Sequence, residues 1–168
     1  MLHKNLYLIG FMGSGKSTIA KVLASLTRAD CIEMDQAIEK SRNMTISSIF
    51  EKYGEESFRD SETQLIKDLS QKENQIVSCG GGAVLRPENV AMMKNSGRII
   101  LLTASPQTIW KRVRYSTKRP ILNGHMEPDY ISRLMEKRQP AYQSAADLTV
   151  NTDGKKPKAI AEEILDLL

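Results

Sequence analysis

The chain has 168 residues, 40% of them hydrophobic, so we expect one domain built around a single hydrophobic core. Its 24 Lys and Arg against 20 Asp and Glu give a formal net charge of +4, and only 5% of the residues are aromatic. A weak positive charge without aromatic rings interleaved in a basic run argues against nucleic acid as the main partner. No segment resembles a membrane span or a secretory leader, so we expect a cytoplasmic protein that binds no membrane.

The only cysteines and histidines are Cys31, Cys79, His3 and His125. Two cysteines are too few for a disulfide framework, and none of the four residues has the close spacing of a zinc site. We therefore expect two buried, reduced thiols and no zinc.

A glycine-rich stretch at residues 10–17, GFMGSGKS, follows the short apolar run at residues 6–9. Apolar side chains then recur at steps of three and four from Ile19 to Leu26, which predicts a helix. A strand, a glycine-rich loop with lysine and a helix, in this order, are typical of a phosphate-binding loop. A turn that merely joins strand to helix is the alternative, but the lysine and both flanking elements favour a nucleoside triphosphate site.

Each residue type in this loop suits a bound triphosphate. Gly10, Gly13 and Gly15 would let backbone N–H groups approach phosphate oxygens, and the start of the helix adds its dipole. Lys16 would reach the β- and γ-phosphates, while the Ser17 hydroxyl would bind Mg²⁺. The residues that we assign to nucleotide binding here are Gly13, Ser14, Gly15, Lys16, Ser17 and Thr18.

The rest of the chain alternates short apolar runs with helical periodicity. Further strands are predicted at residues 31–33, 75–79, 98–102 and 148–150. Helices are predicted at about residues 36–41, 45–53, 55–69, 106–114 and 130–144, and from about 87 and from 157. This order implies an α/β fold, a five-stranded parallel sheet with helices on both faces. Residues 115–129, with little periodicity, are predicted to form a mobile loop.

Two polar or glycine-rich stretches follow predicted strands, where ligands gather in such folds. Glu33 and Asp35 come after the second strand, and one carboxylate could hold a metal-bound water while the other binds an acceptor hydroxyl. Asp35 could instead be the N-cap of the helix that contains Ile38, and the sequence leaves both alternatives open. Gly80, Gly81 and Gly82 follow the third strand and favour direct contact between backbone N–H groups and a ligand.

Two arginines stand out from an ordinary solvated surface. Arg138 falls on the apolar stripe of its predicted helix, together with Ile131 and Tyr142. A charge on a buried face needs an anionic partner or must extend to solvent. Arg59 precedes Glu62 by three residues, a spacing at which the carboxylate could hold the guanidinium in place.

Six segments, in this order and spacing, resemble the shikimate kinase family. They are GFMGSGKST, the acidic pair with Ile38-Glu39, Gly54-Glu55-x-x-Phe58-Arg59-x-x-Glu62, Ser78-Cys79-Gly80-Gly81-Gly82, Arg119-Pro120-Ile121-Leu122 and Arg138-x-Pro140-x-Tyr142. The resemblance extends from Leu6 to about Thr152. It implies a P-loop fold of the nucleoside-monophosphate-kinase type over residues 1–168, with a substrate-binding region at about 33–61 and a mobile lid at about 112–129.

The resemblance also implies an activity. Members of the family transfer the γ-phosphoryl group of ATP, with Mg²⁺, to the 3-hydroxyl of shikimate in aromatic amino-acid biosynthesis. Asp35 matches the residue that binds the shikimate hydroxyls and is assigned as the base, and Arg59 and Arg138 match the pair that binds the carboxylate. Residues 80–82 match the backbone contact to the ring. No partner chain is implied, so we expect a monomer.

On the phosphate side, Arg119 matches the lid arginine that reaches the transferring phosphate, and Arg112 matches the one that lies against adenine. Pattern alone assigns neither. The implied catalytic residues are Lys16, Asp35 and Arg119. The family usually has aspartate where this chain has Glu33, so metal binding by Ser17 and, through water, by Glu33 involves a side chain one methylene longer.

Two other functions share parts of this pattern. A kinase of the same fold acting on gluconate or a nucleoside monophosphate would have the phosphate loop and the lid, but Arg59, Arg138 and the triple glycine favour shikimate. A nucleotide-dependent binding or regulatory protein would keep Lys16 and Ser17. Glu33 is the only residue that supports this second alternative.

Overall fold

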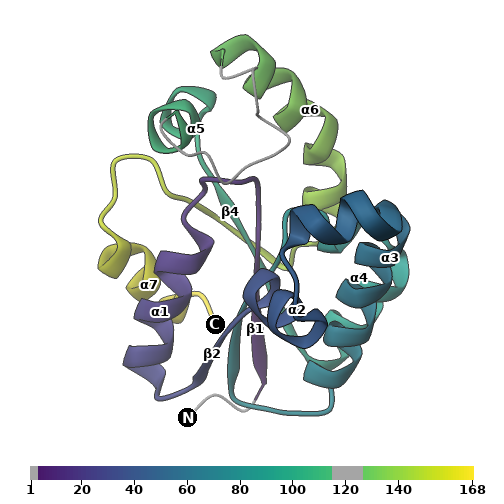
Figure 1. Cartoon of the computed structure of the whole chain (residues 1–168). Helices are drawn as coiled ribbons and strands as arrows, with labels where there is room; N and C mark the ends of the chain where they lie inside the picture. The colour runs from purple at the N-terminus through teal and green to yellow at the C-terminus, as the bar shows by residue number, and fades with distance from the viewer. Residues whose placement is uncertain (1–3, 115–126) are drawn as a thin grey trace.

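The computed structural model describes residues 4–114 and 127–168, which form three layers with a parallel sheet between two layers of helices (Figure 1). The sheet has five strands in the order β2-β3-β1-β4-β5. The strands are β1 (Asn5–Ile9), β2 (Asp30–Glu33), β3 (Gln75–Ser78), β4 (Gly97–Thr103) and β5 (Leu148–Asn151). All four strand pairings are parallel, so the predicted fold class is confirmed.

Seven α-helices and one 3₁₀ turn lie between or after the strands within the described ranges. They are α1 (Lys16–Thr27), α2 (Met34–Arg42), α3 (Ile46–Leu69), η1 (Ala83–Leu85), α4 (Pro87–Ser96), α5 (Pro106–Val113), α6 (Pro128–Ala145) and α7 (Pro157–Asp166). Proline begins the last four α-helices, where its missing N–H costs nothing. Thr45 and Ser105 cap α3 and α5 by accepting a hydrogen bond from a backbone N–H of the first turn.

The two faces of the sheet bury separate apolar clusters, because side chains alternate along each strand. On β1, Tyr7 and Ile9 pack with residues of α3, α4, α5 and α6. Leu6 and Leu8 point to the opposite face and pack with α1 and α7. All five residues of β1 are buried. The glycine-rich loop starts at the carboxyl end of this central strand.

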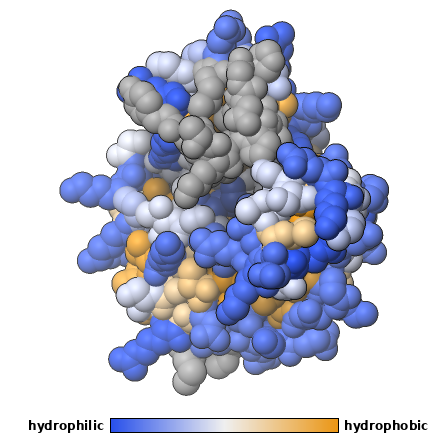
Figure 2. Space-filling view, in the orientation of Figure 1, coloured by the Kyte–Doolittle hydropathy of each residue, from blue (hydrophilic) through white to orange (hydrophobic). Residues whose placement is uncertain are grey.

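A kink at Gly54 divides α3. The sequence predicts two helices that meet there, and Gly54 has φ 81° and ψ 170°, which no helical residue adopts. A side chain in this conformation would be strained, so glycine is required. Ile49 before the kink and Phe58 after it pack with Ile38 of α2 in a small cluster apart from the main core. Figure 2 shows that the face carrying α2 and α3 is mainly hydrophilic.

The structure corrects two sequence expectations. Cys79 is buried as predicted, and burial raises the pKa of its thiol, but Cys31 is exposed. Cys31 lies in β2, an edge strand that pairs only with β3, so its side chain is not covered by a second neighbour. The predicted loop at 115–129 falls mostly on residues 115–126, outside the described residues, and residues 128–129 instead begin α6.

Within residues 4–114 and 127–168, no helix is long and apolar enough to cross a membrane. His3 and His125 lie outside these ranges. Among the described side chains, no group of three or more His, Cys, Asp or Glu could hold a metal ion.

Candidate active site

The carboxyl ends of β1, β2 and β3 bring the predicted site residues to one edge of the sheet. Ser78 is aligned with Leu8 of β1 on one side and with Glu33 of β2 on the other. The glycine-rich loop follows β1, Asp35 follows β2 and the triple glycine follows β3. Three segments far apart in the sequence therefore meet where open α/β folds bind ligands.

The glycine-rich loop leads directly into α1. Gly15 has φ 98° and occupies the N-cap position, so the helix begins at Lys16 with its first N–H groups facing the loop. The Lys16 ammonium donates to the carbonyl oxygens of Gly10 at 2.8 Å and Phe11 at 3.1 Å. Buried Ser14 Oγ has no hydrogen-bond partner among the described residues. An N–H-lined helix start, a lysine and an unpaired hydroxyl suit phosphate oxygens.

Glu33 lies beside the serine that the sequence assigns to a metal. Ser17 Oγ donates to Glu33 Oε2 at 2.9 Å, and Ser78 Oγ lies 3.4 Å from Ser17 Oγ. The other carboxylate oxygen, Glu33 Oε1, is buried and has no hydrogen-bond partner in the described part of the chain. Hydroxyl and carboxylate oxygens are the ligands that Mg²⁺ prefers, alone or through its waters, so these residues fit that ion together with nucleotide phosphates.

The N-cap alternative for Asp35 is wrong. Glu33 occupies the N-cap position of α2, with extended φ and ψ, and Asp35 lies inside the first turn. The helix begins two residues earlier than predicted because Met34 is buried and continues the apolar face toward Ile38. Asp35 is exposed at the site edge, where its negative charge also suits the helix start.

Asp35 and Glu62 flank Gly80. A Cβ at position 80 would lie 2.7 Å from Glu62 Oε1 and 3.1 Å from Asp35 Oδ1, so only glycine fits between the two carboxyl groups. The Glu62 residue is 1% exposed, and its Oε1 has no hydrogen-bond partner in the described residues. Burial raises the pKa of Glu62, and the Arg59 guanidinium offsets this only in part.

Arg59 is held from both sides along its own helix. Its Nη1 donates to Glu62 Oε2 at 2.7 Å, as the spacing predicted, while Nε and Nη2 donate to Glu55 Oε1 at 3.3 and 3.1 Å. Burial lowers the pKa of Arg59, but the two carboxylates more than compensate. The guanidinium lies so close to Gly82 that a Cβ there would clash with it. From the sequence, Glu55 is named only within the family resemblance and its contact with Arg59 is not predicted, although the spacing of four residues was a signal.

Arg138 reaches the triple glycine from α6. Its Nη1 donates to the Gly81 carbonyl oxygen at 3.3 Å, and the hydroxyl of Tyr142 donates to the same oxygen at 2.7 Å. Burial raises the pKa of Tyr142 to about 12, so the phenol stays protonated as a donor. The structure thus brings Arg59 and Arg138 to adjacent glycines. Tyr142 was predicted only as a core residue, and its contact with Gly81 could not be derived from helical spacing.

Of the two arginines predicted to bind the nucleotide, only Arg112 lies within the described residues. Arg112 Nη1 donates to the Gly13 carbonyl oxygen at 2.9 Å and to Thr152 Oγ1 at 3.2 Å, so its side chain joins the glycine-rich loop to the segment after β5. This position is compatible with a nucleotide base bound beside the loop. Arg119 and most of the predicted lid lie outside the described residues.

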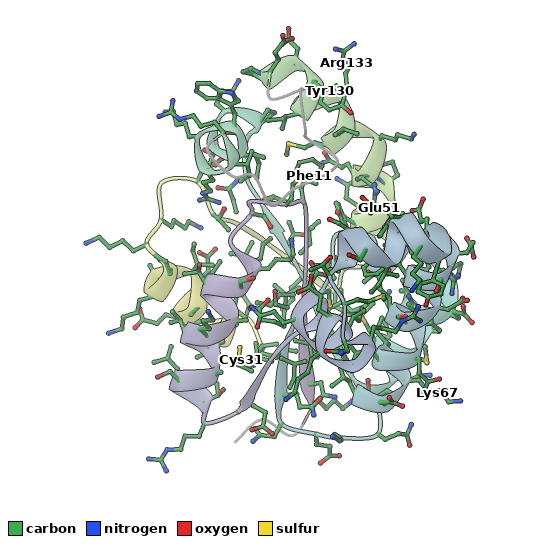
Figure 3. The ribbon with its side chains drawn as sticks, in the orientation of Figure 1. Phe11, Cys31, Glu51, Lys67, Tyr130 and Arg133 are labelled. Atoms are coloured by element: carbon green, nitrogen blue, oxygen red, sulfur yellow. The ribbon has the colours of Figure 1, made fainter. Side chains whose placement is uncertain are left out.

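A cavity of about 290 Å³ lies between the end of β4 and α6. Phe11, Met135 and Tyr142 are among its lining residues, and Figure 3 shows Phe11 at the end of β1 that faces α6. The cavity therefore adjoins the candidate site through Phe11 of the glycine-rich loop and Tyr142, although none of the described residues assigned to the site from the sequence lines it.

The sequence of the chain matches known proteins over almost its whole length. The family described as shikimate kinase matches residues 12–168. A shikimate kinase from Thermodesulfovibrio yellowstonii is 41% identical over 162 residues, which cover 96% of this chain and 93% of the relative. The chain belongs to the shikimate kinase family. This family comprises kinases that phosphorylate shikimate with ATP, so the predicted enzyme class is confirmed.

The fold agrees with this family. A solved structure of shikimate kinase from Acinetobacter baumannii in complex with shikimate has a TM-score of 0.92 and 31% identity, covering 98% of this chain and 92% of that one. A gluconokinase from Sinorhizobium meliloti has a TM-score of 0.65 at 17% identity. The second likeness shows the fold alone, so it does not support the gluconate alternative.

Proposed function

We propose that this chain transfers the γ-phosphoryl group of ATP to the 3-hydroxyl of shikimate, with Mg²⁺ as cofactor. The observation that carries the proposal is the arrangement of Arg59 and Arg138 on adjacent glycines, beside Asp35 and the glycine-rich loop. Two guanidinium groups next to the carboxyl group of Asp35 suit a small, hydroxylated carboxylic acid. Membership of the shikimate kinase family identifies that acid as shikimate.

On the acceptor side, Arg59 and Arg138 bind the shikimate carboxylate, and the backbone of residues 80–82 contacts the ring. Asp35 binds the hydroxyls, orients the reacting one and accepts its proton. Proton acceptance comes late, because the attacking oxygen forms little bonding in a loose transition state. Glu62 acts through Arg59, whose guanidinium it holds against Gly82.

On the phosphate side, residues 13–18 bind the triphosphate and Arg112 lies against the adenine. Ser17 and, through water, Glu33 would hold Mg²⁺, which would neutralise charge on the phosphate oxygens. Lys16 and Arg119 neutralise the moving phosphoryl group. Because the transition state is loose, in-line positioning and this positive charge supply most of the catalysis.

The proposed organisation is a single kinase domain over residues 1–168, with a substrate-binding region at about 33–61 and a lid at about 112–129. Closure of the lid would exclude water, which otherwise competes with shikimate as phosphoryl acceptor. We further propose that the protein is a cytoplasmic monomer.

Measurement of ADP release with ATP and Mg²⁺ against four acceptors tests the proposal. We expect turnover with shikimate and none above background with gluconate, AMP or CMP. Arginine binds phosphates as well as carboxylates, so Arg59 and Arg138 alone do not set this order, and the preference for shikimate rests on membership of the family. Faster turnover with any of the other three acceptors would contradict the proposed substrate.

A further inference from the structure

We propose that Glu55 is a place-holder for the acceptor carboxylate, which must displace it from Arg59 in order to bind. The inference rests on the proposed function, in which Arg59 binds the carboxylate of shikimate. It makes Glu55 a positioning residue that sets how tightly the enzyme binds acidic acceptors.

The contact between Glu55 and Arg59 uses the part of the guanidinium best suited to a carboxylate. Glu55 Oε1 accepts from both Nε and Nη2, at 3.3 and 3.1 Å, and these two N–H groups point in parallel along one edge. Such an edge is the fork that grips substrate carboxylates with two hydrogen bonds. Glu62 takes only Nη1, so Glu55 is the residue that occupies the fork.

The two carboxylates on Arg59 differ in how easily they can leave. The Glu62 side chain is 1% exposed, and moving it would strand a buried charge, whereas the Glu55 side chain is 60% exposed and can turn into water. Glu55 also directly follows the kink at Gly54, which has open space around it. Glu55 is therefore the displaceable partner and Glu62 the permanent one.

The charges around the acceptor site favour replacement of Glu55 by the acceptor carboxylate over binding of the acceptor with Glu55 still in place. The carboxyl groups of Asp35, Glu55 and Glu62 lie near the guanidinium groups of Arg59 and Arg138. The Arg86 guanidinium also acts on Glu62, but it is paired with Glu56 and Asp60. An acidic acceptor would add a further negative charge at close range, which is unfavourable in a partly buried site. If Glu55 leaves as the acceptor carboxylate enters, the number of negative charges on Arg59 is unchanged.

Removing Glu55 should therefore strengthen acceptor binding. Because an ion pair whose carboxylate is 60% exposed stabilises weakly, Glu55→Ala should lower the Kd for shikimate about two- to fivefold. The KM for shikimate should fall with kcat unchanged, since the bound complex no longer contains Glu55 on the fork. Glu55→Asp keeps the charge but is one methylene shorter, so it should also bind shikimate more tightly.

Glu56→Ala is the matched control. Glu56 is the next residue, its side chain is 88% exposed, and it pairs with Arg86 at 2.8 Å instead of with Arg59. Its removal deletes the same charge from the same helical turn and leaves the fork occupied. Any gain in shikimate affinity that Glu56→Ala shares with Glu55→Ala is caused by the loss of one negative charge and not by release of the fork.

The experiment is calorimetric titration of shikimate into the wild type, Glu55→Ala, Glu55→Asp and Glu56→Ala, with steady-state kinetics of each. Tighter binding in both Glu55 variants than in Glu56→Ala supports displacement. Unchanged or weaker binding in the Glu55 variants overturns it and makes Glu55 a permanent support of Arg59.

Arg59→Lys distinguishes failure of this inference from failure of the proposed function. Lysine still neutralises Glu62 but lacks the fork, so this variant should bind shikimate more weakly than the wild type if Arg59 binds the carboxylate. If Arg59→Lys binds shikimate like the wild type, Arg59 is not the carboxylate site at all.

Discussion

The phosphate side of the candidate site is built mostly from backbone, whereas the acceptor side is built from charged side chains on separate elements. Residues 10–15 form one continuous loop that leads into the first turn of α1, where Lys16 and Ser17 lie. The acceptor side joins Asp35 of α2, Arg59 of α3 and Arg138 of α6 around three glycines. The geometry of the phosphate side therefore depends on one local segment, whereas the geometry of the acceptor side depends on the packing of three helices. The difference predicts that mutations on the two sides will have different kinetic signatures.

The largest effect is expected for Lys16→Ala. Loss of the ammonium that neutralises the moving phosphoryl group should reduce kcat at least about a hundredfold, by analogy with the removal of one charge-stabilising donor. The side chain is not part of any of the three apolar clusters, so the fold should be intact by circular dichroism. Normal ADP release from a folded Lys16→Ala protein would show that the loop does not act on the γ-phosphate.

Arg138→Ala should have the next largest effect, and it should be confined to the acceptor. Removing one partner of a desolvated carboxylate costs about 2–5 kcal/mol, so shikimate binding should weaken well over tenfold. Arg138→Lys should restore only part of this, because lysine lacks the planar fork. Calorimetry with ATP compares the two sides of the site. If Arg138→Ala weakened ATP binding as much as shikimate binding, the phosphate side and the acceptor side would not be independent.

Tyr142→Phe tests the link between α6 and the triple glycine. The variant loses one hydrogen bond to the Gly81 carbonyl, which Arg138 continues to satisfy, so the free energy of unfolding should fall by about 0.5–1.5 kcal/mol. Urea denaturation measures this change. The KM for shikimate should rise slightly with kcat unchanged, and a raised KM for ATP instead would place Tyr142 on the phosphate side.

The smallest effect is expected for Glu33→Asp. If Glu33 holds only a metal-bound water, the shorter carboxylate should keep most of kcat and mainly shift the Mg²⁺ concentration at half-maximal rate. A titration of activity against Mg²⁺, with Mn²⁺ as a second ion, resolves the two quantities. Complete loss of activity at an unchanged metal requirement would assign Glu33 a different role.

The same contrast explains how much the sequence could predict. The loop at residues 10–17 is recognisable because its function depends on local backbone geometry, and the strands follow from continuous apolar runs. The Arg59–Glu62 pair follows from helical spacing. In contrast, Arg138 and Gly81 are 57 residues apart, and nothing in either local pattern specifies that they touch.

Two of the errors have the same origin. The exposure of Cys31 depends on β2 being an edge strand, which is a property of sheet order and not of its own apolar residues. The start of α2 at Met34 depends on burial of that side chain against the core. Capping signals alone placed the helix start too late, because Asp35 also favours the first turn of a helix.

The central claim is that Arg59 and Arg138 bind the acceptor as a carboxylate, and calorimetric binding of shikimate and of its neutral carboxamide to the wild type tests it most directly. The carboxamide keeps the ring and hydroxyls but cannot pair with two guanidinium groups, so we expect it to bind more than tenfold more weakly than shikimate. Equal affinity for the acid and the carboxamide would contradict the account, because the acceptor would then not be recognised through its charge.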